Sequence, residues 1–180
     1  HMIEIQEGRA EELERAILGN KLDAAITLIG AETPERLRAT PLYTEPYKLL
    51  LPSNHPLAGQ GKVNAVDLAS QPMIARRSCE FLARTSQFFT ERGVRPPFSF
   101  KSHNDERAIA LVAAGVGVTV APATFGRSGL ALLDMQDFDF SRTVGFALPP
   151  VRSLAKESED ALLDAARDAA RTIRAVASLR

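Results

Sequence analysis

The amino-acid sequence predicts an α/β fold with two lobes. Twice along the chain, a strand-like stretch is followed by a helical stretch and then by a second strand, an order typical of parallel βαβ units. With 180 residues and 45% hydrophobic content, the chain is long enough to bury a core. We expect lobe I to comprise residues 3–70 and 149–180 and lobe II residues 71–148, so that the chain passes twice between the lobes.

The first βαβ unit is expected at the start of the chain. Ile3–Glu7 alternates apolar and polar residues, as a half-buried strand does. Arg9–Asn20 carries apolar residues at helical spacing. Leu22–Ile29 is a nearly continuous apolar run, which predicts a strand covered on both faces. Further strand-like stretches lie around Leu42–Tyr43 and Tyr47–Leu51.

The same order of elements returns in lobe II. The apolar patterns predict strands at Met73–Ala75, Phe98–Phe100 and Val116–Ala121, and helices at Ser78–Arg92 and Asp105–Ala114.

Three more elements and one short turn complete the prediction. Val66–Ala69 has the pattern of a single helical turn, and Leu130–Leu133 and Thr143–Leu148 have that of strands. Ser153–Arg180 has apolar residues at helical spacing throughout. We expect this last helix to return and cover lobe I.

The composition excludes several classes of function. Lys plus Arg and Asp plus Glu number 22 each, so no net charge draws the chain to a phosphate backbone or an anionic membrane. The single cysteine, Cys79, excludes an internal disulfide or a zinc site built on cysteine pairs. No nucleophile-elbow, Walker-type or paired-histidine motif occurs. We therefore expect a non-enzymatic protein without cofactor or metal, located in the reducing cytoplasm.

Four short motifs, taken in order, point to a family. They are Glu7-Gly8 with the following Gly19-x-x-Leu22-Asp23; the turn His55-Pro56-Leu57-Ala58; the pair Asp67-Leu68 before Pro72; and Leu111–Pro122 with its Gly115-x-Gly117. The two glycines follow a helix and not a strand, so they read as a helix end and a tight turn instead of a dinucleotide fingerprint. Together the four motifs closely resemble the regulatory domain of LysR-type transcriptional regulators.

The resemblance implies a fold like that of periplasmic binding proteins. Two crossing strands would form a hinge between the lobes, and a small-molecule effector would bind in the cleft. In the family, DNA is bound through an N-terminal winged helix-turn-helix, and the full-length proteins form homodimers or tetramers. Family domains also begin with a strand and a helix before the position that matches Ile3. We expect that first strand and helix to be missing here, which would expose a sheet edge.

Ligands of open α/β sheets bind beyond the carboxyl ends of the strands, near helix N-termini. The residues expected there are Gly8, Arg9, Thr27, Arg76, Arg77, Ser78, Asn104, Pro122 and Thr124. Arg76 or Arg77 could clamp an anion, which favours a carboxylate-bearing effector. Ser78 and Asn104 could equally serve only as helix N-caps, and either arginine could simply be solvated.

Three other functions stay open at this point. Peroxide-sensing members of the family carry a reactive cysteine in a region similar to that of Cys79, but the stretch matching their second cysteine reads Phe88-Phe89. An ordinary, partly buried Cys79 is the favoured interpretation. A solute-binding protein of a transport system shares the implied fold, and a two-lobed enzyme is disfavoured because no acid, base and nucleophile converge.

Overall fold

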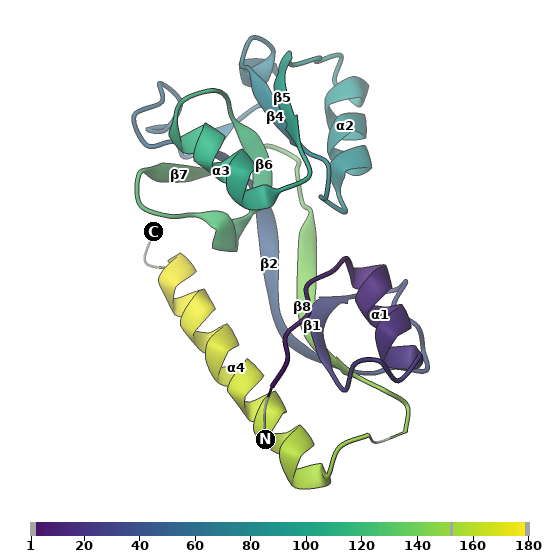
Figure 1. Ribbon diagram of the computed structural model, residues 1–180. Helices are drawn as coiled ribbons and strands as arrows, with labels where there is room; N and C mark the ends of the chain where they lie inside the picture. Colours follow the sequence, from purple (N-terminus) through teal and green to yellow (C-terminus); the bar gives the residue numbers. More distant parts are fainter. Residues whose placement is uncertain (1–2, 152, 179–180) are drawn as a thin grey trace. The chain divides into compact units, whose positions relative to one another are not determined.

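Figure 1 shows the computed structural model, which describes residues 3–151 and 153–178. Helices and strands are interspersed along the chain, so the predicted mixed α/β class is confirmed. The chain divides into two compact units: unit 1 comprises the chain up to Glu45 together with Arg142–Val176, and unit 2 is built from Pro46–Ser141. The chain thus passes between the units at residues 45–46 and 141–142. The sequence pattern predicts these passages at residues 70–71 and 148–149.

Unit 1 contains two helices and three strands. They are α1 (Ala10–Leu18), β1 (Ala25–Ile29), the first part of β2 (Arg38–Pro52), β8 (Ser141–Leu148) and α4 (Lys156–Ser178). Ile17 of α1 is fully buried against Leu37 and Ala147. The predicted packing of the last helix on the first unit is confirmed, because Ala166 of α4 is buried with Phe146 and Leu148 of β8. The end of that predicted helix, residues 179–180, lies outside the described residues.

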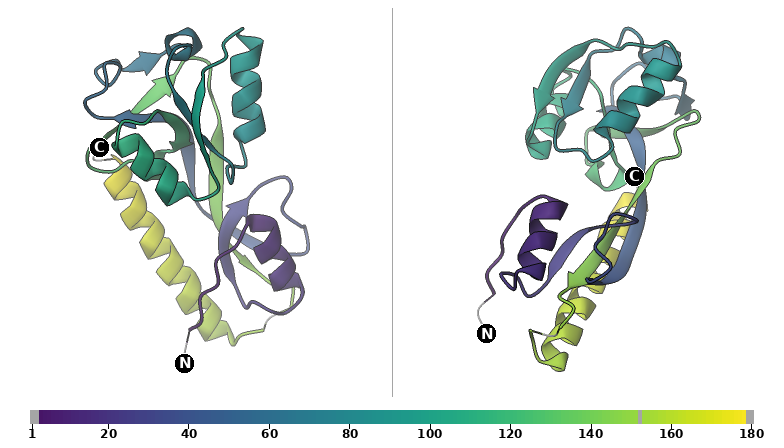
Figure 2. Two further views of the ribbon diagram at one scale, coloured as in Figure 1. Left: turned by 45° about the horizontal axis from the view of Figure 1, so that its top comes forward. Right: turned by 90° about the vertical axis from the view of Figure 1, so that its right-hand side faces the viewer.

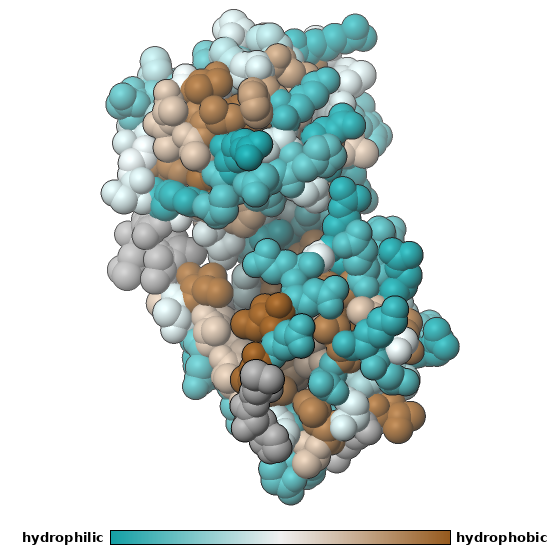
Figure 3. All heavy atoms as spheres, in the orientation of Figure 1, coloured by the Kyte–Doolittle hydropathy of each residue, from teal (hydrophilic) through white to brown (hydrophobic). Residues whose placement is uncertain are grey.

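The first predicted βαβ unit is wrong. Ile3–Glu7 forms no strand with any described residue, and the side chains of Ile3 and Ile5 are 72% and 85% exposed. Figure 3 shows apolar side chains at the surface beside this N-terminal segment. β1 pairs antiparallel with β8 alone, and Ile26 is 55% exposed. An apolar run predicts burial on both faces only where a layer covers each face, and β1 lacks one.

Unit 2 holds the remaining elements. They are the second part of β2, β3 (Lys62–Val63), the 3₁₀ turn η1 (Ala65–Leu68), β4 (Met73–Arg76), α2 (Leu82–Glu91), β5 (Phe98–Ser102), α3 (Asp105–Ala113), β6 (Thr119–Pro122), the 3₁₀ turn η2 (Ala123–Phe125) and β7 (Leu130–Met135). β6 and β7 pair antiparallel with β2, while β4 and β5 form a parallel pair. The second predicted βαβ unit, β4-α2-β5, is therefore confirmed.

Helices α2 and α3 pack on opposite sides of the β4–β5 pair, as Figure 1 and Figure 2 show. Met73 of β4 is buried with Phe88 and Phe89 of α2. The next residue, Ile74, is buried with Ile109 and Val112 of α3. Successive side chains of a strand point to opposite faces, so this alternation fixes which helix covers which face of the sheet.

The predicted start of α2 at Ser78 is wrong, because the helix begins at Leu82. The backbone N–H of Arg77 still donates to the carbonyl of Ser102 at 2.7 Å, and that of Cys79 donates to the carbonyl of Arg76 at 3.1 Å. These bonds extend the strand and then close a turn. None of the described helices is long and apolar enough to cross a membrane.

Candidate effector-binding site

Arg76 organises the carboxyl ends of the strands in unit 2. Its side chain is 2% exposed, and its Nε and Nη2 atoms donate to the two carboxylate oxygens of Asp105 at 2.9 and 2.8 Å. Nη1 donates to the carbonyl of Val120 at 3.3 Å, and the guanidinium lies 4.7 Å from the ring centre of Phe125. One side chain therefore joins the end of β4, the start of α3, β6 and η2.

This pairing determines the charge state of Arg76. Burial alone would lower the pKa of Arg76, but the hydrogen bonds and the negative charge of Asp105 outweigh burial and raise the pKa above its ordinary value. The guanidinium stays protonated, and the Asp105 carboxylate already occupies two of its donors. A bidentate carboxylate pair of this kind satisfies the planar fork of an arginine.

The loop after β4 is fastened to the start of α3. The hydroxyl of Ser78 donates to Oδ1 of Asp105 at 3.0 Å, so Ser78 is a tether and not the N-cap of α2. The neighbouring Arg77 is exposed. Of the two adjacent arginines, one is buried and paired and the other is turned to the surface.

Asn104 acts as the N-cap of α3, one of the two roles considered for it. Its side-chain oxygen accepts from the backbone N–H of Arg107 at 2.8 Å. Its own N–H donates to the hydroxyl of Ser102 at 3.1 Å. Pro122 is fully buried at the end of β6, and Thr124 follows it in η2. The unit 2 residues chosen from the sequence thus gather at the ends of β4, β5 and β6.

The unit 1 residues chosen from the sequence lie at two places. Gly8 precedes α1, and Arg9 is its N-cap residue, whose backbone N–H donates to Oε2 of Glu12 at 3.1 Å. Thr27 is buried in β1, where it lies opposite Gly145 of β8. That Gly8, Arg9 and Thr27 border a crevice shared with the unit 2 group stays a prediction.

Sequence reasoning missed the partners that organise this region. Asp105 was expected only as the first residue of a helix, although an acidic residue at such a position is a recognisable signal. Tyr47 was expected only within a strand, yet its hydroxyl donates a short hydrogen bond to Oε1 of Glu80. The Tyr47 ring also lies 5.0 Å from that of Phe81. Pairs separated by about 30 residues leave no local pattern in a sequence.

The sequence pattern places Cys79 inside a helix. In the structure Cys79 lies in the loop before α2, which begins at Leu82. The thiol is therefore not in the first turn of a helix, where the helix dipole would lower its pKa. Burial raises the pKa of Cys79, and the nearby positive charge of Arg76 only partly offsets this effect. The side chain is half-buried. The thiolate, which is the reactive form, is thus disfavoured.

In open α/β folds, the carboxyl ends of the strands, where these polar residues gather, are the usual place for a small-molecule site. Residues 2–171 match the family model of the LysR substrate binding domain. The chain belongs to this family, whose members are regulatory and not enzymatic, and it is an effector-binding domain that senses a small molecule.

Relatives with described roles are regulators. A probable hydrogen peroxide-inducible genes activator of Mycobacterium avium is 31% identical over 138 residues, which cover 72% of this chain and 44% of the relative. The transcriptional dual regulator GltC of Bacillus subtilis is 32% identical over 125 residues, covering 66% of this chain and 41% of the relative. The chain thus spans less than half the length of these two curated relatives.

Solved structures share the fold. The C-terminal domain of a probable LysR family regulator from Rhodococcus sp. RHA1 matches with a TM-score of 0.71 at 23% identity, covering 96% of this chain and 84% of that one. The regulatory domain of Synechocystis PCC6803 CcmR, solved in complex with 2-PG, matches with a TM-score of 0.69 at 20% identity, covering 90% and 80%. The effector binding domain of QuiR, solved with shikimate, matches with a TM-score of 0.64 at 17% identity, covering 92% and 76%.

Proposed function

We propose that this domain binds a small anionic metabolite in a cleft between its two units, with the loop after β4 as the anion contact. Binding would shift the population of arrangements of the units. That shift would pass to a winged helix-turn-helix that binds DNA in a cytoplasmic dimer or tetramer.

The exposed guanidinium of Arg77 is the observation that carries this proposal. Arg77 directly follows the buried, paired Arg76, and the loop is fastened through Ser78 to Asp105. A cation on a held loop loses little conformational entropy when it binds an anion. Arg76, in contrast, contributes by holding the loop, because Asp105 already takes its donors.

The chemistry of the relatives' ligands supports the same class. The structure of the QuiR domain holds shikimate, a small carboxylic acid. Gly8, Arg9 and Thr27 of unit 1, with Asn104, Pro122 and Thr124 of unit 2, remain the proposed further contacts. Asn104 would contribute through its amide nitrogen, since its oxygen caps α3.

The test is calorimetric titration of small aliphatic and aromatic acids into the wild-type domain and into Arg77→Gln. A charged hydrogen bond contributes about 1.5–3 kcal/mol, so we expect the substitution to weaken binding of an acid by roughly tenfold or more. Arg36→Gln, at an exposed arginine of unit 1, is the control and should leave affinity unchanged. Equal affinity of wild type and Arg77→Gln would contradict the proposal.

Redox sensing through Cys79 is the alternative raised by the name of the Mycobacterium avium relative. The chain has one cysteine, and burial raises its pKa. Cys79 therefore has no second thiol in this sequence with which to form a disulfide. Small-molecule binding is therefore the function that we propose.

A further inference from the structure

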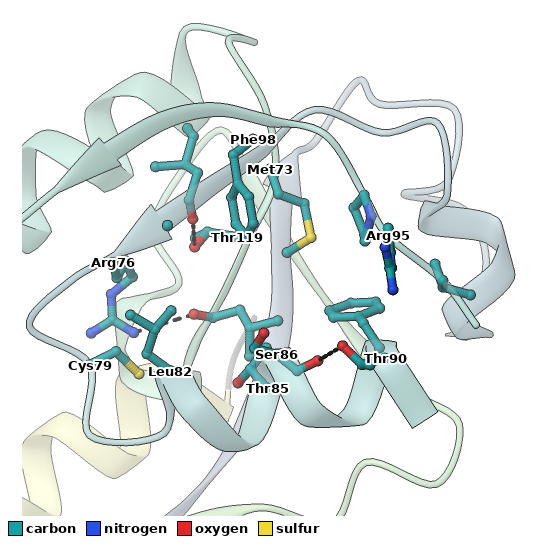
Figure 4. A pocket seen from close by; sticks show the side chains of 16 residues that line it. Met73, Arg76, Cys79, Leu82, Thr85, Ser86, Thr90, Arg95, Phe98 and Thr119 are labelled. Atoms are coloured by element: carbon teal, nitrogen blue, oxygen red, sulfur yellow. Dashed lines mark hydrogen bonds between the residues drawn. The ribbon is translucent and has the colours of Figure 1, made fainter. Parts of the chain in front are cut away.

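A pocket within unit 2 lies between helix α2 and the strands β4, β5 and β6 (Figure 4). Arg76 and Cys79 line it, whereas Arg77 does not. The volume of the pocket is about 390 Å³, at the lower end of the range of about 300–1,000 Å³ that small-molecule sites occupy. All of its lining residues belong to unit 2. The pocket is therefore a property of this unit alone.

The face of α2 that borders the pocket, on which Ser86 and Thr90 are exposed, explains why the space stays open. Leu82, Thr85, Ser86, Phe89 and Thr90 line the pocket, and their spacing places them on one side of a helix. Three of these five residues are small and carry hydroxyls, where a helix packed on a sheet usually has bulky apolar side chains. The sheet face opposite is therefore only partly filled by this helix.

The shape of the pocket favours a linear ligand. The lining residues follow α2 from Leu82 to Thr90, a length of about 12 Å at 1.5 Å per residue. Met73 and Phe98 lie across from the helix (Figure 4). Phe98 is 55% exposed, so an apolar ring borders the opening. Met73, Leu82, Phe89 and Phe98 give this length an apolar part beside the hydroxyls of α2, and that part matches an extended alkyl chain.

The two ends of the pocket differ in charge. Arg76 lies at one end and Arg95 at the other (Figure 4). The charge of Arg76 is neutralised by Asp105, whereas the exposed Arg95 has no ion pair with any residue that the structure describes. The ammonium of Lys101, which does not line the pocket, lies 5.9 Å from the ring centre of Phe98. Positive charge therefore borders the opening, and the hydroxyl of Thr90 lies on the same side.

We propose that this pocket binds a straight-chain monocarboxylate of about eight carbons. Its carboxylate contacts Arg95 at the opening, and its chain runs along α2 towards Leu82 and Cys79. The site is separate from the cleft of the proposed function, because the exposed Arg77 does not line it. Sodium octanoate is the probe, and 1-octanol is its uncharged counterpart.

The first experiment measures octanoate binding to the whole chain by calorimetry. We expect saturable binding of one octanoate, weakened about tenfold by Arg95→Gln because a charge-assisted hydrogen bond is lost. Binding of 1-octanol should not change in that variant. Ser86 and Gln87 are both exposed, but only Ser86 lines the pocket. Ser86→Trp sets a large ring at the pocket wall and should weaken binding strongly, whereas Gln87→Trp should leave it unchanged. Arg36→Gln, at an exposed arginine of unit 1, should bind octanoate as the wild type does.

The second experiment needs no variant. Cys79 lines the pocket and is the only cysteine of the chain, so N-ethylmaleimide labels this one site. Saturating octanoate should slow the labelling of Cys79 several-fold, and acetate at the same concentration should not. The proposal is overturned if octanoate shows no saturable binding or leaves the labelling rate unchanged. It is equally overturned if Arg95→Gln, or a folded Ser86→Trp, binds octanoate with the affinity of the wild type. Loss of octanoate binding in Arg77→Gln would instead assign the ligand to the cleft.

Discussion

At the scale of single residues, the pair Arg76–Asp105 has the largest consequence for the site. The side chain of Arg76 is 2% exposed and that of Asp105 31% exposed. An unpaired charge in such a place is far more costly than a lost surface ion pair. Asp105 also accepts from Ser78. The same carboxylate therefore holds both the buried cation and the loop that bears Arg77.

Replacement of Asp105 by alanine should destabilise the domain by about 3 kcal/mol, since it leaves the guanidinium of Arg76 buried without its partner. Glu106→Ala is a matched control: both residues lie in the first turn of α3, so both interact with the helix dipole. Glu106 pairs with Arg127 at the surface, where the side chains are 75% and 43% exposed, and its loss should cost about 0.5 kcal/mol. Urea unfolding of the two variants measures the difference, and equal losses would refute the argument.

At this scale the sequence predicts which side chains lie near the strand ends, but it does not predict their contacts. Arg76, Ser78 and Asn104 follow from the rule that ligands and caps gather at strand ends and helix starts. The sequence does not reveal that Arg76 is the buried arginine of the adjacent pair. That outcome depends on Asp105, which is 29 residues away and meets Arg76 only once β4 and α3 have packed.

At the scale of elements, the turn between α3 and β6 decides how closely the central strands approach. Gly115 has a φ of +75°, and its N–H donates to the carbonyl of Val112 at 2.9 Å, as expected for a residue that ends a helix. Gly117 has a different role. A Cβ atom there would lie 2.5 Å from the carbonyl oxygen of Pro72, a backbone atom that cannot move without shifting β4.

Gly117→Ala should therefore destabilise the domain by about 1–3 kcal/mol, the usual cost of overpacking. The clash lies next to the bridge between Met73 and Val118, so the amides of β4 and β6 should lose protection from hydrogen exchange first. Gly59→Ala is the control, because no atom lies within 4 Å of an added Cβ there. Unchanged thermal unfolding of Gly117→Ala would show that β4 can yield at this point.

Periodicity predicted elements well where they pack on a neighbour and poorly elsewhere. The helix at α3, the strand at β4 and the turn at η1 all agree with the structure. The segment Ile3–Glu7 has a strand pattern but no strand partner among the described residues. An alternating pattern specifies which side chains could face a core, and pairing with another strand must still supply the hydrogen bonds.

At the scale of the whole molecule, one long strand joins the two units. β2 extends over 15 residues, Arg38–Pro52, and runs through the division after Glu45. The sequence shows two separate strand-like stretches, because Thr44, Glu45 and Pro46 interrupt the apolar pattern. The boundary between two compact units depends on contacts between segments that are distant in the sequence. Local patterns alone therefore cannot place either passage.

An ion pair lies on unit 1 directly beside these passages. Nε of Arg142 donates to Oε1 of Glu45 at 2.8 Å, and the two side chains are only 15% and 5% exposed. Glu45 is the last residue of unit 1 before the first passage, and Arg142 is the first residue after the second. Burial raises the pKa of the neighbouring Tyr43, and the charge of Glu45 adds to the effect while that of Arg142 opposes it.

Replacing Glu45 by glutamine should therefore affect β2 on both sides of the division. The ion pair between the buried Arg142 and Glu45 is lost, which should cost up to about 3 kcal/mol and speed hydrogen exchange along β2 and β8. The pKa of Tyr43 should fall, because the contribution of Glu45 disappears while that of Arg142 remains; ultraviolet titration in a Tyr47→Phe background follows this one tyrosine. Asp134→Asn is the control. Asp134 of β7 is the exposed ion-pair partner of Lys48, which lies on β2 like Glu45, and its replacement should change stability by less than about 1 kcal/mol. If exchange along β2 and the Tyr43 titration both stay as in the wild type, the ion pair does not stabilise the passages.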